Sequence, residues 1–311
     1  MNRIDALKFA MVVLAAWLVS GCHTMTRPDA AASLPTGDPR AALVGDYDNH
    51  EQVSNAAAQA PPAVAFRVDP LPREGWLAWR THLRSATTLE ATWLLRVDAG
   101  ADGGLVVVPH RPLVADAPTD KRFDAAQWVA LDACALRGTR TAAGFEARAD
   151  AAACATIAPG IGVEAALLPL AIEHAGEWLR VRLFADQARG ENARAEARRV
   201  QWFVGWGAIN GAGDKATADS TDWHMNKDLR IGNEGGRAAL NWRDGRPSGW
   251  SLRLERLTYR DGNMPVLRLS LIEDAGNHVL AYAWANPDAT SIGLNLGWVQ
   301  IGLTREAAGK R

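Results

Sequence analysis

The chain has 311 residues, which suits one or two domains, and its 3 Cys are too few for a miniprotein built on disulfides. Hydrophobic residues make up 48% and charged residues 22%, a composition typical of a globular chain. With 34 Lys and Arg against 35 Asp and Glu, no positive excess is available for binding nucleic acid. The chain has 13 Trp against 3 Tyr and 6 Phe, so large rigid side chains must fill a core or line a binding site.

The first residues predict export and lipidation. Arg3 and Lys8 precede an apolar stretch at 10–19, about half of the roughly 20 residues that span a membrane, as is typical of a secretory signal peptide. The stretch 19–22, Val-Ser-Gly-Cys, resembles the bacterial lipobox. This resemblance implies a diacylglycerol thioether on Cys22, cleavage before it and acylation of the new amino terminus. The alternative is an ordinary signal peptide with a chance cysteine.

The segment after Cys22 is expected to be a flexible tether. Residues 23–40 contain almost no large apolar side chains and would reach roughly 23 Å from the membrane. His23, rather than Asp, follows the cysteine, which by analogy with enteric lipoproteins favours the outer membrane, with the protein facing the periplasm.

Strand patterns dominate the next part of the chain, and two helices are expected. One helix begins at Asp48 or Asn49 and runs to Pro61, with Glu51 or Gln52 as the partner of the capping residue. The other lies within 185–199, where a charged loop is the alternative because Gly190 interrupts the segment. The strand patterns are at 76–83, 91–97, 105–108, 128–136, 145–148, 178–184 and 200–206.

From residue 242 the pattern predicts an antiparallel meander. Strands at 250–254, 267–271, 279–285 and 291–304 are separated by turn clusters. In the last of these, Gly293 and Gly297 alternate with apolar residues, so a backbone or a bulky ring can approach that face closely. Hairpin-linked strands of this length predict a barrel or a sandwich.

Cys134 and Cys154 are expected to form a disulfide, because two cysteines remain in an oxidising compartment. Two free buried thiols are the alternative. The 7 His show no ligand spacing, so no metal site is expected.

Residues 45–52, G-D-Y-D-N-H-E-Q, resemble the opening motif of the CpcT/CpeT family of bilin lyases. Weaker similarity continues at Ala133-Cys134, 144–147, Cys154 and 176–190. The resemblance covers about residues 41–206 and implies a calycin-like antiparallel barrel that attaches a linear tetrapyrrole to a cysteine thiol. The motif matches at Gly45, Tyr47, Asp48, Asn49 and Gln52.

Together these patterns predict a mainly all-β protein with one or two short helices. The expected organisation is a signal peptide at 1–21, a tether at 22–40, a barrel at 41–206, an antiparallel region at 207–304 and a tail at 305–311. Whether residues 207–304 complete the barrel or form a separate domain is left open.

Aromatic and basic residues of the first half are the candidates for ligand binding. The Trp residues could stack on a ring system and the Arg residues could pair with ligand carboxylates; the alternatives are core filling and exposed strand charge. Asp46 and Asp48 could act as acid or base groups at the barrel mouth, or be solvated and capping residues. The expected ligand-binding residues are Tyr47, Trp76, Trp79, Arg80, Trp93 and Trp128, with Arg84 beside them.

Three functions follow from this sequence. The first is an outer-membrane lipoprotein that binds a hydrophobic, tetrapyrrole-like ligand in its barrel. The second is a bilin lyase, although no catalytic residue can be named. The third is a structural or interaction lipoprotein whose Trp residues fill the core. The expected partners are the membrane and a small hydrophobic ligand, a homodimer is compatible with the sequence, and nucleic acid is not expected.

Overall fold

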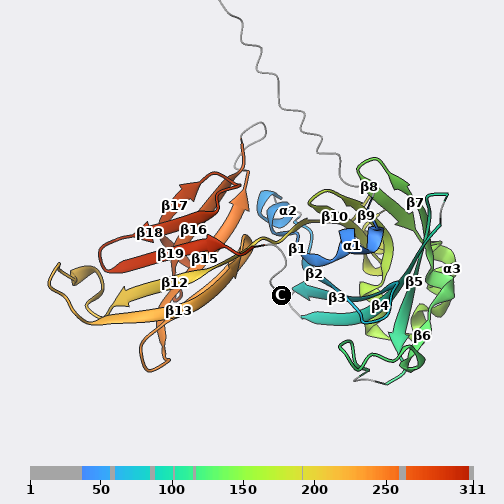
Figure 1. The fold of residues 1–311 in the computed structure, drawn as a ribbon, viewed down its shortest axis with the longest axis horizontal. Helices are drawn as coiled ribbons and strands as arrows, with labels where there is room; N and C mark the ends of the chain where they lie inside the picture. The colour runs from blue at the N-terminus through green and yellow to red at the C-terminus, as the bar shows by residue number, and fades with distance from the viewer. Residues whose placement is uncertain are drawn as a thin grey trace, which may run out of the picture. The chain divides into compact units, whose positions relative to one another are not determined.

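The computed structural model describes residues 37–307 except 57–59, 85–87, 101, 115–116, 191 and 259–263. The described residues belong to one compact unit and form three antiparallel sheets (Figure 1). The predicted signal peptide, the lipidation site Cys22 and nearly all of the tether lie outside the described residues.

Ten strands of the largest sheet close into an antiparallel barrel, which confirms the predicted fold class. The order is β4-β3-β2-β1-β11-β10-β9-β8-β7-β5, and β5 pairs back with β4. A short strand, β6 (Trp128–Ala130), pairs with β5 outside the closed ring. The strands are β1 (Gly45–Asp48), β2 (Ala63–Pro70), β3 (Trp76–Arg84), β4 (Leu89–Ala99), β5 (Gly104–Pro112), β7 (Leu136–Thr141), β8 (Gly144–Arg148), β9 (Pro169–Ala175), β10 (Trp178–Leu183) and β11 (Ala195–Arg199).

Alternation along the strands places apolar side chains inside the barrel. In β2, Val64, Phe66 and Val68 are buried in the main core, whereas Arg67 and Asp69 point outward. The same period of two holds in the neighbouring strands, so one core fills the ring.

Short helices pack against the barrel. Helix α1 (Pro39–Leu43) places Leu43 in the barrel core. Helix α2 (His50–Asn55) follows β1 directly. The remaining ones are α3 (Ala151–Ile157) and the 3-10 turns η1 (Ala125–Gln127), η2 (Asp132–Cys134), η3 (Ala158–Gly160), η4 (Val163–Leu167) and η5 (Phe184–Arg189).

The rest of the chain forms two four-stranded sheets that share a second core, and its strands do not join the barrel. One sheet has the order β13-β12-β19-β18 and the other β14-β15-β16-β17. The strands are β12 (Trp202–Asn210), β13 (Trp223–Gly232), β14 (Glu234–Asn241), β15 (Pro247–Leu257), β16 (Val266–Glu273), β17 (His278–Ala285), β18 (Ser291–Asn295) and β19 (Val299–Arg305), with η6 (Gly213–Lys215) between β12 and β13.

Two predicted strands are each divided in the structure. The segment 128–136 leaves the ladder at η2, which places Cys134 against Cys154 of α3. The final segment 291–304 turns back at Gly297, whose φ of 83° favours glycine, and forms the β18–β19 hairpin.

The predicted helix within 185–199 is also corrected. Its second half is the barrel strand β11, which pairs with both β1 and β10. Ala195 and Ala197 point into the barrel core there, so tertiary pairing outweighs the helix propensity of an Ala-, Glu- and Arg-rich segment. The first predicted helix is shorter than expected: α2 ends at Asn55, whereas the prediction extended it to Pro61.

Candidate functional site

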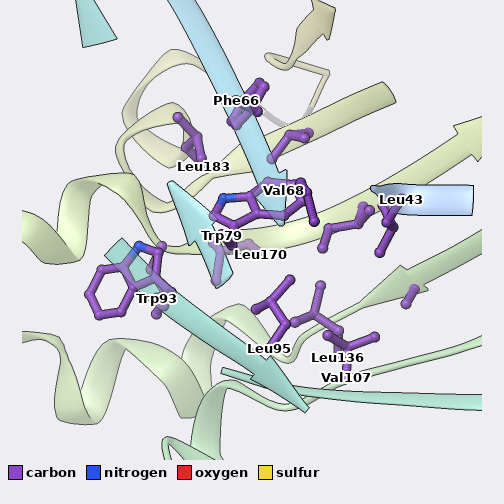
Figure 2. Close-up of a cluster of buried hydrophobic side chains, with 14 of the residues drawn as sticks. Leu43, Phe66, Val68, Trp79, Trp93, Leu95, Val107, Leu136, Leu170 and Leu183 are labelled. Atoms are coloured by element: carbon purple, nitrogen blue, oxygen red, sulfur yellow. The ribbon is translucent and has the colours of Figure 1, made fainter. Parts of the chain in front are cut away.

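Three of the predicted ligand-binding residues lie inside the barrel. Tyr47 and Trp79 are 0% exposed and Trp93 is 2% exposed. Figure 2 shows Trp79 and Trp93 among Phe66, Leu183 and other interior side chains. The rings of Phe66 and Trp79 lie 5.3 Å apart in a tilted arrangement. The structure therefore brings these residues together.

The indole N–H groups of the two interior Trp residues both donate hydrogen bonds to acceptors of the protein. Trp79 Nε1 donates to Thr81 Oγ1 at 2.9 Å, and Trp93 Nε1 donates to the Leu167 carbonyl at 3.2 Å. A side chain with almost no accessible surface borders no space that can hold a water molecule, so these rings pack directly on their neighbours. In this structure they fill the interior instead of lining a hollow.

Trp76 and Trp128 belong to a separate cluster on the outside of the barrel wall. The ring of Trp76 lies 4.6 Å from His110 and 5.6 Å from Phe123. Burial lowers the pKa of His110, which favours its neutral form. The predicted set of Trp residues is thus divided between two apolar clusters.

The two candidate arginines point away from the barrel interior and are already paired. Arg80 forms an ion pair with Asp69 and donates to Thr119 Oγ1 at 2.6 Å. Arg84 donates to Asp48 at 2.6 Å. Neither guanidinium faces a ligand space inside the barrel.

An outer cleft of about 420 Å³ contains these pairs. Asp46 and Asp48 line it, since they alternate with the inward-facing Tyr47. Asp46 accepts a hydrogen bond from Trp202 Nε1 at 2.9 Å. Burial raises the pKa of Asp48, against the opposing effect of Arg84. The cleft therefore presents paired charges, and its acids lie on the outer wall instead of at a barrel mouth.

Asn49 does not cap α2 through its side chain, contrary to one predicted pairing. Its side chain accepts from Val64 N at 2.8 Å and donates to the Pro62 carbonyl at 2.9 Å. It also donates to Gln52 Oε1 at 3.1 Å. The 45–52 motif thus fixes the connection between β1, α2 and β2.

A polar cluster lies where α1 meets the barrel core. Tyr47 donates to the Leu43 carbonyl at 3.1 Å, and Arg199 donates to the Tyr47 hydroxyl, the carbonyls of Ala42 and Val44, and His174 Nε2. Within the described part of the chain no carboxylate pairs with Arg199. Burial, together with the positive charge of Arg199, lowers the pKa of His174 to about 4.

A buried ionic cluster, which the sequence pattern did not reveal, joins β11 to α2 and β14. Arg198 is 4% exposed and donates to both oxygens of Glu234, at 2.8 and 3.0 Å, and to Glu51 at 2.6 Å. This bidentate geometry is typical of a guanidinium–carboxylate ion pair. Burial lowers the pKa of Arg198, but its carboxylate partners outweigh burial and raise it. Burial pushes the pKa of Glu234 upward, but both of its oxygens accept guanidinium hydrogens, so we assign the charged pair.

A second ionic cluster surrounds Glu255 of β15. The carboxylate contacts His50 Nε2 at 3.0 Å and accepts from Arg268 at 2.7 Å, with Arg253 at 3.1 Å. These partners outweigh burial and lower the pKa of Glu255 to about 2. No local spacing in the sequence indicates either ionic cluster, because each joins residues that are far apart in the chain, such as His50 and Glu255.

The structure contains the predicted disulfide between Cys134 and Cys154. It connects η2 to α3, with both cysteines buried.

The described residues contain neither a candidate membrane-spanning helix nor a candidate metal-binding cluster. No helix there is long and apolar enough to cross a membrane. No group of three or more His, Cys, Asp or Glu residues in the same ranges could hold a metal ion.

Comparison with known proteins identifies no relative: no family model, no curated protein and no solved structure matches the chain. The CpcT/CpeT resemblance of residues 45–52 accordingly stays a prediction.

Proposed function

We propose that the chain is a non-catalytic interaction lipoprotein, anchored through Cys22 to the outer membrane and facing the periplasm. The lipobox-like sequence supports the anchor. The Cys134–Cys154 disulfide suits an oxidising compartment.

One observation favours this function over the other two. The aromatic residues expected to line a ligand cavity, Tyr47, Trp79 and Trp93, are packed side chain against side chain in the barrel core. A barrel filled in this way acts as a rigid scaffold, and its surface carries the binding.

The interior is tested by titrating the protein with haem and with a bilin while Trp fluorescence is recorded. We expect no saturable quenching of the wild-type protein. Trp93→Ala, which vacates a large interior volume, should gain binding of a small apolar probe. Trp284→Ala removes an exposed ring and is the matched control. Saturable binding to the wild-type barrel would instead support the carrier function.

The anchor is tested separately by mass analysis of the mature amino terminus. We expect Cys22 to carry a diacylglyceryl group on its sulfur and an acyl chain on its amino group. The Cys22→Ser variant should carry neither lipid. An unmodified thiol at this position would remove the anchor from the proposal while leaving the filled barrel intact.

Ligand binding inside the barrel is the second candidate, and the contacts of Arg199 favour it. This guanidinium faces neutral partners, and the buried His174 Nδ1 beside it has no hydrogen-bond partner among the described residues. If α1 withdrew, these groups would face the space it leaves and could hold the acidic group of an apolar ligand, including a tetrapyrrole. Lyase activity is supported only by the family resemblance, and a bilin-transfer assay to a thiol tests it.

A further inference from the structure

A pocket lies where α2 meets strands β15 and β16. Its volume is about 420 Å³, many times the roughly 30 Å³ that one water molecule occupies in the liquid, so it has room for a small ligand. Side chains of α2 form one side, and side chains of the two strands and of the residue after β15 form the rest. The described lining residues are His50, Ser54, Asn55, Arg253, Glu255, Leu257, Thr258 and Arg268.

Alternation along β15 turns charged side chains toward this pocket. Leu252 and Leu254 belong to the second core, so Arg253 and Glu255 lie on the opposite face of the sheet. Arg268 of β16 is the cross-strand partner of Glu255 and donates to its carboxylate at 2.7 Å. The sheet thus places two guanidinium groups beside one carboxylate.

The described lining carries more positive than negative charge. Glu255 is the one acid among the described lining residues, against Arg253 and Arg268. Burial raises the pKa of Glu255, but hydrogen bonds from His50 and Arg268 and the charges of both arginines outweigh it and lower the pKa to about 2. The carboxylate is therefore ionised, and this lining keeps one excess positive charge even when His50 is neutral.

Arg253 can supply donors to a bound anion. Its Nε lies 3.1 Å from Glu255 Oε2, yet this nitrogen is buried and has no hydrogen-bond partner among the described residues. The Arg253 side chain is 23% exposed, so a ligand in the pocket can reach it. A guanidinium has five N–H donors in a planar fork, a geometry that matches the oxygens of phosphate and carboxylate groups.

We propose that this pocket binds the phosphate group of a phosphate ester, with Arg253 as its main donor. The pocket offers polar groups from two sides, because Ser54 and Asn55 of α2 face the guanidinium groups of the sheet across it. The three terminal oxygens of a phosphate group point in different directions and can meet both sides, whereas the two oxygens of a carboxylate share one plane. A phospholipid headgroup and a soluble phosphate ester both present this group.

The inference goes beyond the proposed function. It depends neither on the lipid anchor at Cys22 nor on the filled barrel interior, since all the lining residues lie on α2, β15, β16 and the residue after β15. Failure of the phosphate site would therefore leave the anchor and the filled barrel intact.

Isothermal titration calorimetry of the full-length protein, in a neutral detergent and a phosphate-free buffer, tests the site. Glycerol 3-phosphate represents a soluble ester, dihexanoyl phosphatidic acid represents a lipid headgroup, and acetate is the carboxylate control. We expect saturable binding of a phosphate probe and much weaker binding of acetate. Tighter binding of phosphatidic acid would assign the site to a lipid headgroup, and otherwise it belongs to a soluble ester.

Three variants connect the binding to Arg253. Arg253→Gln should weaken phosphate binding by about tenfold or more, because it removes charge-assisted hydrogen bonds. Arg137→Gln removes the same charge from an exposed position of barrel strand β7 and should leave binding unchanged. Glu255→Gln should tighten binding, because it removes the anion that competes for both guanidinium groups, a gain that a merely structural role of Arg253 would not produce.

Unchanged circular dichroism and an intact Cys134–Cys154 disulfide confirm folding in each variant. Three results would each overturn the proposal. They are no saturable binding of either phosphate probe to the wild type, acetate binding as tight as phosphate binding, and phosphate binding by Arg253→Gln equal to that by Arg137→Gln.

Discussion

Arg198 on barrel strand β11 donates to both carboxylate oxygens of Glu234 on β14, at 2.8 and 3.0 Å. Arg198 and Glu234 are buried, so each charge depends on the other for compensation. Removing one member of a buried pair is far more damaging than replacing both by apolar groups.

Arg198→Met should therefore lower the free energy of unfolding by about 3–5 kcal/mol, because Glu234 and Glu51 lose their shared partner. The double variant Arg198→Met with Glu234→Leu should recover part of this loss. Chemical denaturation of the wild type, both single variants and the double variant gives the coupling energy. Additive effects of the two substitutions would show that the pair is not coupled.

Trp93→Ala should destabilise the protein by about 3–5 kcal/mol, since it removes a ring packed in the barrel core and a hydrogen bond to the Leu167 carbonyl. Trp284→Ala removes the same type of side chain from a largely exposed position and should change stability by well under half of that amount. Equal effects of the two substitutions in thermal denaturation would argue that the barrel core is loosely packed.

The disulfide should contribute about 3 kcal/mol, because it closes a loop of sequence separation 20 between η2 and α3. Replacing both cysteines by Ser should lower the denaturation midpoint accordingly, and reduction of the wild type should have the same effect. Peptide mapping without reductant should recover Cys134 and Cys154 in one linked fragment. Two separate thiol peptides would contradict the bridge.

His174 predicts the direction of a pH dependence. Its folded-state pKa, about 4, is below the ordinary 6.5, because burial and Arg199 disfavour the imidazolium. As the pH falls from 6.5 to 4, the unfolded chain takes up this proton and the folded chain does not, so the unfolding free energy falls by up to about 3 kcal/mol. His174→Phe should flatten the pH dependence in this window, as measured by denaturation at several pH values. An unchanged slope would mean that His174 is protonated in the fold.

Gly138→Ala should destabilise the β7–β8 hairpin, because a Cβ there would lie 1.8 Å from the Glu146 carbonyl oxygen. A backbone clash of this kind cannot be relieved by rotating a side chain, so we expect a loss above about 2 kcal/mol. Gly160→Ala is the matched control: it has no atom within 4 Å of the added carbon and no positive φ, and it should be nearly neutral. A neutral Gly138→Ala would contradict the close approach of the two strands.

The all-β class and most strand positions were predictable because alternation is a local signal. The strand at 178–184 shows this, since WLRVRL alternates apolar and Arg residues and forms β10. The segment 195–199 was not recognised as a strand, because its Ala, Glu and Arg favour helix locally and its strand form depends on pairing with β1 and β10.

The site was harder to predict than the fold. Tryptophan count alone does not separate core filling from ligand binding, and only the burial of Trp79 and Trp93 decides between them here. The Arg198–Glu234 pair joins residues 36 positions apart, so no local spacing indicates it. The close approach expected in the final strand occurs at Gly293, where an added Cβ would lie 2.8 Å from the Ile301 carbonyl oxygen. It also occurs at Gly302, opposite Trp206, where an added Cβ would lie 3.0 Å from the indole nitrogen.

Native mass spectrometry of the protein purified from its own membrane tests the filled barrel most directly. The account predicts that each folded chain has the mass of the mature polypeptide with its lipid modification, and that unfolding releases no further molecule. A stoichiometric apolar ligand that leaves only when the barrel unfolds would contradict it.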